Sequence, residues 1–458
     1  MKGVKQLVVK TGKSMLDDIL SVPNFATAAE RVIGNKGAPG VDGMTVDEWP
    51  AYAAYHGKEL KLSIRERTYK PKPVRRVEIP KPGTTATRPL GIPTVIDRVV
   101  QTATEQVLSR IWEPTFSEHS YGYRPNRDCH GAMKEVLGYL NDGYTYIVDL
   151  DIKAFFDTVN QDKLISLIRS KVNDSDVLHL IRVFLKAGVM EDGLVKPSEE
   201  GVPQGGAISP LLSNIYLDPL DKELEARGLR FTRYADDVII FTKTQKAADR
   251  VMASVTSWIE RKLFLKVSPT KTKVVTPSKG EYLGFGFWKS RNGWRCKPLE
   301  SRKTRLMDKV RAITCRKKAV ATPLSATVTK LNQTIDGWIN YYAIGDMKTW
   351  LAGTFGPWLR HRVREIMLKQ WKKPTKIMKS LRWYCILYNL NFSDQDLYKV
   401  ANSSRGWYAR ANGDVINFIL NPTVLATPLY KGSGKKRAKV YPGLVNPLLY
   451  YQSRQQKS

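Results

Sequence analysis

Two adjacent carboxylates, Asp236 and Asp237, lie between two short apolar runs. The runs, residues 229–233 and 238–242, are rich in β-branched and aromatic side chains, so we expect two strands joined by a turn at Tyr234–Asp237. Adjacent charges at the tip of a hairpin are costly unless water or a cation balances them. Carboxylate oxygens are ligands that Mg²⁺ prefers, so the pattern suggests a magnesium site, although an ordinary polar turn gives the same four residues.

A third carboxylate stands at the end of another strand-like segment. Residues 144–152 are rich in β-branched and aromatic side chains, which predicts a strand. Because the side chains of a strand alternate between its two faces, Asp149 and Asp151 share one face, and the apolar residues between and beside them share the other. A carboxylate at the end of this strand is a further candidate metal ligand.

Two segments carry groups suited to a nucleotide. Gly201–Pro210 holds one amide side chain, Gln204, in a glycine-rich loop before an apolar helical run. Glycines let a base pair pack directly on the backbone, although glycine and proline are also common where helices begin. Residues 69–93 are basic, extended and proline-rich, which predicts a hairpin with a tip between Lys81 and Arg88 that reaches a triphosphate. A solvated charged hairpin is the alternative.

The remaining apolar patterns predict mostly helices. Apolar side chains recur at helical spacing in these stretches: 95–111, 129–140, 164–168, 177–184 and 251–259. Glu281–Phe287 is predicted to be a strand with close backbone approach at its glycines. Beyond Arg302 the chain is predicted to be helical and very basic, with an apolar stripe from Val328 to Tyr342.

The whole chain is strongly basic. Its 458 residues are 42% hydrophobic, enough for two or three folded domains, and 74 Lys and Arg against 43 Asp and Glu give a net charge of +31. Such an excess favours a long polyanion, usually nucleic acid, as the partner. No stretch approaches the about 20 apolar residues that span a membrane, and the N-terminus lacks an apolar signal-peptide core. We therefore expect a cytosolic protein with no membrane partner.

Cysteine and histidine give no sign of a metal site. The five histidines lack metal-ligand spacing, and the four cysteines form no Cys-x-x-Cys pair. Neither structural zinc nor a disulfide framework is indicated. The four are predicted to be reduced core residues: Cys129, Cys296, Cys315 and Cys385.

The order of these segments resembles the palm of a reverse transcriptase. Asp151 comes first, followed by Pro203-Gln204-Gly205, Tyr234-Ala235-Asp236-Asp237, Lys271 and Leu283-Gly284. Three further segments look like group II intron-encoded reverse transcriptases, also called maturases: Arg88–Pro93, Tyr121–Pro125 and Gly337–Tyr342. The lack of paired cysteines and of a suitable His cluster resembles the compact bacterial class, often called group IIC, so we expect no His-Asn-His endonuclease.

The resemblance implies an α+β fold, a right-hand polymerase with fingers and palm built from antiparallel sheet and helices. Fingers and palm, with an N-terminal extension, would occupy residues 1–300. An α-helical thumb or X domain would follow at 301–385, and a small basic region like a DNA-binding domain at 386–458.

The resemblance also assigns roles to individual residues. It implies that Asp151, Asp236 and Asp237 are catalytic and bind two Mg²⁺ ions together with the backbone carbonyl of Ile152. Asp149 does not match the catalytic position. The nucleotide site would comprise Lys81 and Arg88 at the triphosphate, Phe155 under the sugar, Pro203, Gln204 and Gly205 at the nucleotide–template pair, and Lys271 toward the phosphates. Core packing is the alternative role for Phe155.

The activity implied by the resemblance is RNA-directed DNA polymerisation in a bacterial cytoplasm. Such a protein binds its intron RNA to assist splicing and copies it into target DNA during retrohoming, using an RNA template, a DNA primer and deoxynucleoside triphosphates. Two alternatives stay open. One is a splicing-only RNA-binding maturase; the other is a domesticated reverse transcriptase that acts in DNA repair.

Overall fold

The fold is described from a computed structural model that covers residues 14–80, 87–191, 194–196, 200–431 and 438–456. The chain separates into two compact units, residues 1–276 and 277–458. The boundary between the units precedes the predicted domain boundary at residue 300, and the three-part division stays a prediction.

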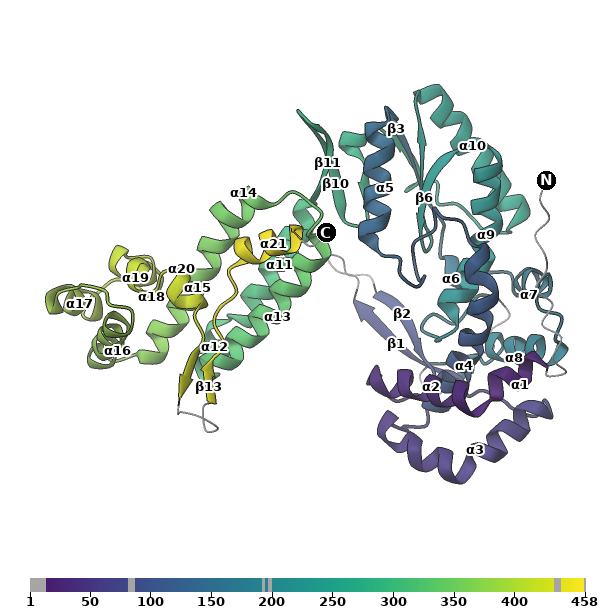
Figure 1. The fold of residues 1–458 in the computed structure, drawn as a ribbon, viewed down its shortest axis with the longest axis horizontal. Coiled ribbons are helices and arrows are strands. Elements are labelled where there is room, and N and C mark those ends of the chain that lie inside the picture. The colour runs from purple at the N-terminus through teal and green to yellow at the C-terminus, as the bar shows by residue number, and fades with distance from the viewer. Residues whose placement is uncertain (1–13, 81–86, 192–193, 197–199, 432–437, 457–458) are drawn as a thin grey trace. The chain divides into compact units, whose positions relative to one another are not determined.

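The first unit contains a four-stranded sheet in the order β6-β7-β3-β8. Figure 1 labels two of its strands, β3 and β6. All of its pairings are antiparallel. Its strands are β3 (Tyr146–Asp151), β6 (Arg230–Tyr234), β7 (Asp237–Thr242) and β8 (Lys273–Val275). The hairpin predicted around the Asp-Asp pair is confirmed, because β6 and β7 pair from Arg230 opposite Phe241 to Tyr234 opposite Asp237.

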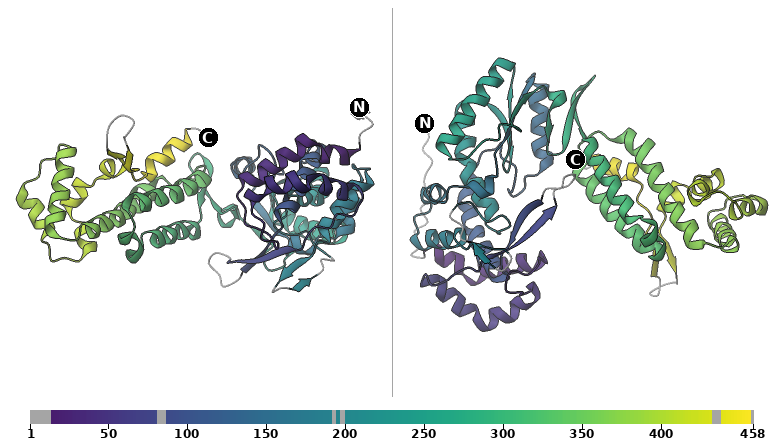
Figure 2. Two further views of the ribbon diagram at one scale, coloured as in Figure 1. Left: turned by 90° about the horizontal axis from the view of Figure 1, so that it is seen from below. Right: turned by 180° about the vertical axis from the view of Figure 1, so that it is seen from behind.

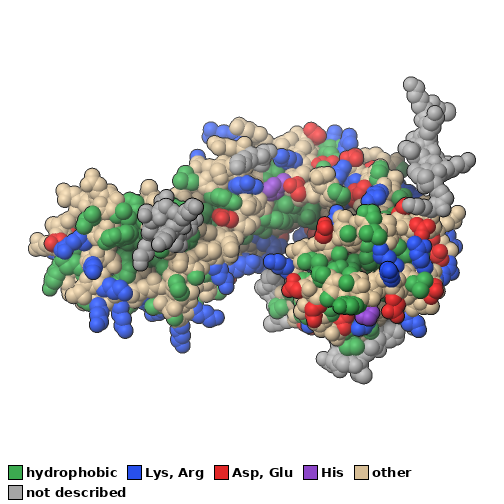
Figure 3. All heavy atoms as spheres, turned by 60° about the horizontal axis from the view of Figure 1, so that its bottom comes forward, with side chains coloured by type: hydrophobic (Ala, Val, Ile, Leu, Met, Phe, Trp, Pro, Cys, Tyr) green, Lys and Arg blue, Asp and Glu red, His purple; other side chains and the backbone are tan. Residues whose placement is uncertain are grey.

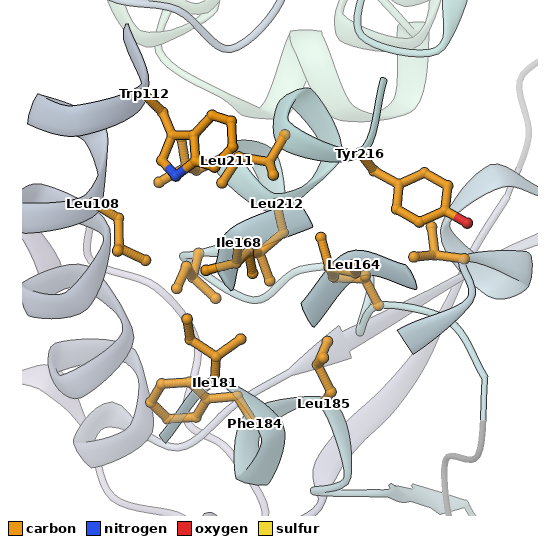
Figure 4. Close-up of a cluster of buried hydrophobic side chains, with 14 of the residues drawn as sticks. Leu108, Trp112, Leu164, Ile168, Ile181, Phe184, Leu185, Leu211, Leu212 and Tyr216 are labelled. Atoms are coloured by element: carbon orange, nitrogen blue, oxygen red, sulfur yellow. The ribbon is translucent and has the colours of Figure 1, made fainter. Parts of the chain in front are cut away.

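Helices pack on this sheet and against one another. Helices α5 (Cys129–Asn141) and α9 (Ser209–Ala226) contact β6, and α10 (Gln245–Lys262) contacts β3, β7 and β8. The apolar faces of α9, α4 (Val95–Trp112), α7 (Gln161–Arg169) and α8 (Ser175–Leu185) meet in one core, shown in Figure 4. Side chains such as Leu212 and Ile181 are almost fully buried there, so this core fixes α9 beside the sheet.

A second sheet in this unit has the order β2-β1-β4-β5. The predicted basic hairpin is confirmed as β1 (Val74–Pro80) and β2 (Thr87–Ile92), which are antiparallel. β1 also pairs in parallel with β4 (Val189–Glu191), which joins β5 (Leu194–Lys196).

The remaining elements of the first unit are helical. The N-terminal helices, purple in both views of Figure 2, lie together at one end of this unit. The bounds are α1 (Met15–Leu20), α2 (Val22–Gly34), η1 (Val46–Glu48), α3 (Trp49–Arg65), η2 (Glu113–Thr115) and α6 (Phe155–Thr158).

The second unit is mostly helical, as predicted. It has a three-stranded sheet, β11-β10-β9, and a hairpin, β12-β13. Its elements are η3 (Pro277–Lys279), β9 (Glu281–Tyr282), β10 (Phe285–Ser290), β11 (Gly293–Pro298), α11 (Glu300–Ile313), α12 (Arg316–Ala321), α13 (Leu324–Tyr342), α14 (Lys348–Trp350), η4 (Leu351–Phe355), α15 (Gly356–Trp371), α16 (Pro374–Leu387), α17 (Asp394–Ala401), α18 (Trp407–Ala411), α19 (Asp414–Ile419), α20 (Pro422–Ala426), β12 (Leu429–Lys431), β13 (Ala438–Tyr441) and α21 (Pro447–Gln455). The predicted α+β class, with antiparallel sheets and many helices, is confirmed.

Two local predictions for this unit were wrong. Glu281–Phe287 is two strands, because Leu283 and Gly284 both have positive φ and form a tight turn that pairs Tyr282 with Phe285. Cys315 is exposed at the start of α12, whereas the other three cysteines are buried. Within the part of the chain that the structure describes, no helix is long and apolar enough to cross a membrane.

Candidate active site

The sheet brings two of the predicted carboxylates face to face. Asp151, the last residue of β3, pairs directly with Asp237, the first residue of β7. Asp236 precedes Asp237 in the two-residue turn between β6 and β7. Ala235 has a φ of 58° and Asp236 does not have a positive φ, which is the pattern of a type II′ turn. Register and turn therefore bring Asp151 next to a pair of adjacent carboxylates that begins 85 residues later in the sequence.

Two lysines balance part of the negative charge. Lys271 Nζ lies 3.3 Å from both carboxylate oxygens of Asp151. Asp149 lies opposite Lys273 across β3 and β8, with 3.7 Å between Asp149 Oδ2 and Lys273 Nζ. Asp149 thus shares the charged face with Asp151, as predicted, but it is paired with a different lysine, Lys273.

Desolvation and the neighbouring carboxylates raise the pKa of Asp237. Its side chain keeps an open face to solvent, yet surrounding protein atoms partly desolvate it. Desolvation raises the pKa of Asp237 to about 6, with added repulsion from Asp236, Asp149 and Asp151 and an opposing effect of Lys271. A carboxylate that is hard to ionise among like charges is a place where an added cation is stabilising.

The donor set fits Mg²⁺. Among the described residues, no three His, Cys, Asp or Glu side chains are grouped closely enough to hold a metal by themselves. Mg²⁺ does not require such a cage, because it is usually bound by one or two carboxylates together with water and substrate phosphates. Asp151 and Asp237, paired across the sheet, and Asp236 beside them are carboxylates that could serve as ligands of this kind.

The chain turns sharply after Asp151. Ile152 is buried and bridges to Val267, and Ala154 has a φ of 46° just before α6. Phe155, the first residue of α6, is only 2% exposed and packs edge-on against Phe156 and Tyr216, with ring centroids 5.2 and 6.2 Å apart. This packing agrees with the core role that the sequence left open for Phe155, and the carbonyl of Ile152 as a metal ligand stays a prediction.

The predicted nucleotide loop is joined to the basic hairpin. Gly91 N donates to Gln204 O at 2.7 Å, and Arg88 Nε donates to Gln204 Oε1 at 3.2 Å. Gly205 has a φ of 111°, and a Cβ there would lie 2.2 Å from Gly91 O. Pro203 O accepts from Ser209 Oγ at 2.7 Å, which ties the loop to the start of α9. The structure brings Arg88, Gln204 and Gly205 together, while Lys81 lies outside the described residues.

Sequence reasoning gave no role to Tyr123, which follows the glycine on which the Asp-Asp turn packs. Burial raises the pKa of Tyr123, as do the charges of Asp236 and Asp237, while Arg88 lowers it. Tyr123 has a φ of 62° and is 48% exposed. An exposed aromatic with a positive φ is unusual, but only its place in Tyr121–Pro125 pointed to it in the sequence.

Sequence reasoning also missed the buried polar residues beneath the Asp-Asp turn. Arg233 and Asp221 are 0% exposed and form an ion pair, and Asn214 is buried next to them. Two signals were available. Strand alternation puts Arg233 on the same face as Phe231, and Asn214 and Asp221 are two helical turns apart on one face of α9.

Comparison with known proteins assigns the chain to a family. Residues 79–287 match the family described as reverse transcriptase (RNA-dependent DNA polymerase), and residues 303–384 match the group II intron, maturase-specific domain. Protein YkfC of Escherichia coli (strain K12) is 33% identical over 297 residues, which are 56% of this chain and 78% of that relative. The chain belongs to the group II intron reverse transcriptase and maturase family. Every predicted site residue lies inside the reverse transcriptase match.

The similarity to a second relative covers only part of that relative's length. Group II intron-encoded protein LtrA of Lactococcus lactis subsp. cremoris is 38% identical over 215 residues, which are 47% of this chain and 36% of LtrA. The chain therefore aligns with only about a third of LtrA. A solved structure, the partial Cas6-RT-Cas1–Cas2 complex, is similar over 57% of this chain and 45% of its own, with 24% identity and a TM-score of 0.36.

Proposed function

We propose that the chain is an RNA-directed DNA polymerase that binds its intron RNA, assists splicing and copies the RNA into target DNA during retrohoming. The observation that carries the polymerase part is the direct pairing of Asp151 with Asp237, next to Asp236, inside the reverse transcriptase match. The maturase part rests on the second family match and on the basic helices around it. The bacterial relatives support a bacterial cytoplasm as the place of action.

In this proposal Asp151, Asp236 and Asp237 hold two Mg²⁺ ions, and the Ile152 carbonyl is a further ligand. When bound, the ions would lower the pKa of the primer hydroxyl and balance the charge of the leaving pyrophosphate. The chain's own residues orient the substrates. Arg88 and Lys81 would hold the triphosphate, and the loop of Pro203, Gln204 and Gly205 would support the nucleotide–template pair.

Roles for one lysine and one phenylalanine complete the proposal. Lys271, whose side chain is 71% exposed, would release Asp151 to the metal and turn toward the phosphates. Phe155 would sit close enough to the sugar to exclude a 2′-hydroxyl. Lys271 already contacts Asp151, and Phe155 comes four residues after Asp151 in the chain.

Primer extension tests the polymerase activity. A DNA primer on an RNA template should be extended with deoxynucleoside triphosphates and Mg²⁺, and chelation of the metal should stop the reaction. A chain that binds the RNA but never extends the primer would refute the polymerase proposal and favour the splicing-only alternative.

Sugar discrimination should weaken in Phe155→Val. The smaller side chain opens space beside the sugar, so we expect the preference for deoxynucleotides over ribonucleotides to fall by about tenfold or more. The ratio of kcat/KM for the two substrates on one template measures it. Phe156→Val is the matched control, because it removes the same atoms from the neighbouring buried ring. An unchanged ratio in Phe155→Val, or an equal change in both variants, would reduce Phe155 to a packing residue.

The basic surface of the second unit supports RNA as its partner. Figure 3 shows Lys and Arg side chains projecting from this unit. Exposed lysines lie on or beside α11, α12 and α16: Lys309, Lys317, Lys318, Lys372, Lys373, Lys376 and Lys379. Arg364 is different, because it is 5% exposed and donates to Leu420 O at 2.9 Å. It supports the fold of the helices rather than contacting a phosphate.

RNA affinity should depend steeply on salt. For six to ten phosphate contacts we expect it to fall about a thousandfold or more between about 50 and 200 mM salt. Lys376→Ala combined with Lys379→Ala should reduce the slope of log affinity against log salt by about two. Fluorescence anisotropy with labelled intron RNA measures the slope. Lys246→Ala, an exposed lysine on α10 outside the maturase match, should leave it unchanged, and a flat dependence in the wild type would contradict RNA binding through these lysines.

A further inference from the structure

A fully buried ion pair lies directly beneath the turn that carries Asp236. The Arg233 and Asp221 side chains are each 0% exposed. They are joined by two hydrogen bonds, from Arg233 Nε to Asp221 Oδ1 at 2.7 Å and from Arg233 Nη2 to Asp221 Oδ2 at 2.6 Å. Because desolvation offsets most of the attraction, such a pair adds little to stability compared with apolar residues of similar size. Its presence in this core calls for another explanation.

The third side-chain nitrogen of Arg233, Nη1, offers an explanation for the buried ion pair. Nη1 donates to Ala235 O at 2.9 Å and to Asn214 Oδ1 at 3.0 Å. Asn214 in turn donates from Nδ2 to Gly122 O at 2.9 Å. The ion pair fixes the plane of the guanidinium, so Nη1 is held in the direction of the Ala235 carbonyl. One buried network therefore connects α9, the segment before α5 and the turn itself.

The backbone of the segment before α5 also holds the turn. Tyr121 N donates to Arg233 O, and Arg233 N donates to His119 O, each at 2.9 Å. A Cβ on Gly122 would lie 2.2 Å from Ala235 N, so the backbone of the turn rests directly on this glycine. Ala235 has a positive φ, which a non-glycine residue adopts only when its surroundings compensate for the strain. The peptide between Ala235 and Asp236 would relax by rotating if the bond to Nη1 were lost.

We propose that Arg233, Asp221 and Asn214 are positioning residues, which fix the Ala235 carbonyl and thereby aim the Asp236 and Asp237 carboxylates at the metal ions. The inference rests on the proposed function, since it assumes that these carboxylates bind metal. Residues of this kind touch no substrate; they act through the backbone of the turn. Loss of groups that orient metal ligands typically weakens metal binding about ten- to a hundredfold.

Two variants test the network in the full-length chain. Arg233→Met with Asp221→Leu replaces the ion pair by apolar side chains of similar volume, which keeps the core filled but removes Nη1. Asn214→Ala removes one support of Nη1 and leaves the ion pair. The matched control is Asn24→Ala, since Asn24 is also buried and donates to a distant carbonyl, Ala103 O at 2.9 Å, between α2 and α4.

Mn²⁺ binding to the chain with primer and template, followed by electron paramagnetic resonance, is the main readout. The Kd for Mn²⁺ should rise about tenfold or more in both network variants, and kcat for primer extension should fall while KM for primer–template stays the same. Asn24→Ala should lower the Tm without changing that Kd.

Wild-type Kd and kcat in both network variants would overturn the inference, as would an equal rise of Kd in Asn24→Ala. If the double variant does not fold, the Kd of Asn214→Ala decides alone. If the wild type binds Mn²⁺ but extends no primer, the proposed function fails, while a raised Kd in the variants still supports the positioning role.

Discussion

Replacing Asp236 by alanine should reduce deoxynucleotide incorporation about a thousandfold or more, because it removes a proposed metal ligand from the place where charge develops during the reaction. Asp236 lies in the turn and is half-exposed, so its loss opens no cavity in the core. Binding of primer and template should persist, since exposed lysines far along the sequence carry most of the proposed phosphate contacts. Single-turnover incorporation and anisotropy measure the two effects separately.

Asp249→Ala is the control for this prediction. Asp249 is an exposed aspartate on α10, so its loss changes the net charge of the chain by the same amount. Its incorporation rate should match that of the wild type. Asp236→Asn keeps the shape of the side chain without its charge and should be nearly as impaired as alanine. Substantial incorporation in Asp236→Ala would refute the assignment of this residue to the metal site.

Gly205→Ala should lower kcat/KM for the incoming nucleotide about a hundredfold, since displacements of about 1 Å in a substrate-positioning loop have effects of this size. An added Cβ would lie 2.2 Å from the backbone oxygen of Gly91, and the φ of 111° is one that alanine avoids. The loop must therefore move away from β2. The movement would lengthen the bonds from Gly91 N and Arg88 Nε to Gln204.

Gly228→Ala separates collision from backbone strain. Gly228 also has a positive φ, of 65°, but nothing lies within 4 Å of a Cβ added there. It should cost about 1 kcal/mol of stability, as other left-handed positions do, and leave nucleotide incorporation unchanged. Steady-state kinetics with a varied nucleotide concentration distinguish the two variants. Equal kinetics in both would mean that the contact of the loop with β2 has no role in nucleotide binding.

The sequence predicted best where the signal was local. The hairpin around Asp236 needed only two apolar runs and a turn, and the basic hairpin of β1 and β2 needed only residues 69–93. Asp151 is different, because no local pattern says that it pairs with Asp237. That pairing depends on the strand order β6-β7-β3-β8, and only the resemblance to a family implied it.

Interactions between distant segments account for most of what the sequence did not reveal. Arg233 and Arg364 are both buried, and their partners, Asp221 and Leu420, come from other elements of the fold. Tyr123 belongs to the site because the turn packs on its neighbour Gly122. Each case depends on a contact across many residues, and alternation or helical spacing alone does not specify the partner.

The strand order also determines when the central sheet can form during translation. β3 is an inner strand, yet both of its neighbours, β7 and β8, are translated much later. Until Lys273–Val275 has left the ribosome, at least one edge of β3 has no partner strand. Asp151 therefore stands at the end of an incomplete sheet during this time. Because non-local strand pairing is slow and exposes aggregation-prone edges, chaperones should favour a soluble product, and any fragment that ends before Val275 should be difficult to fold.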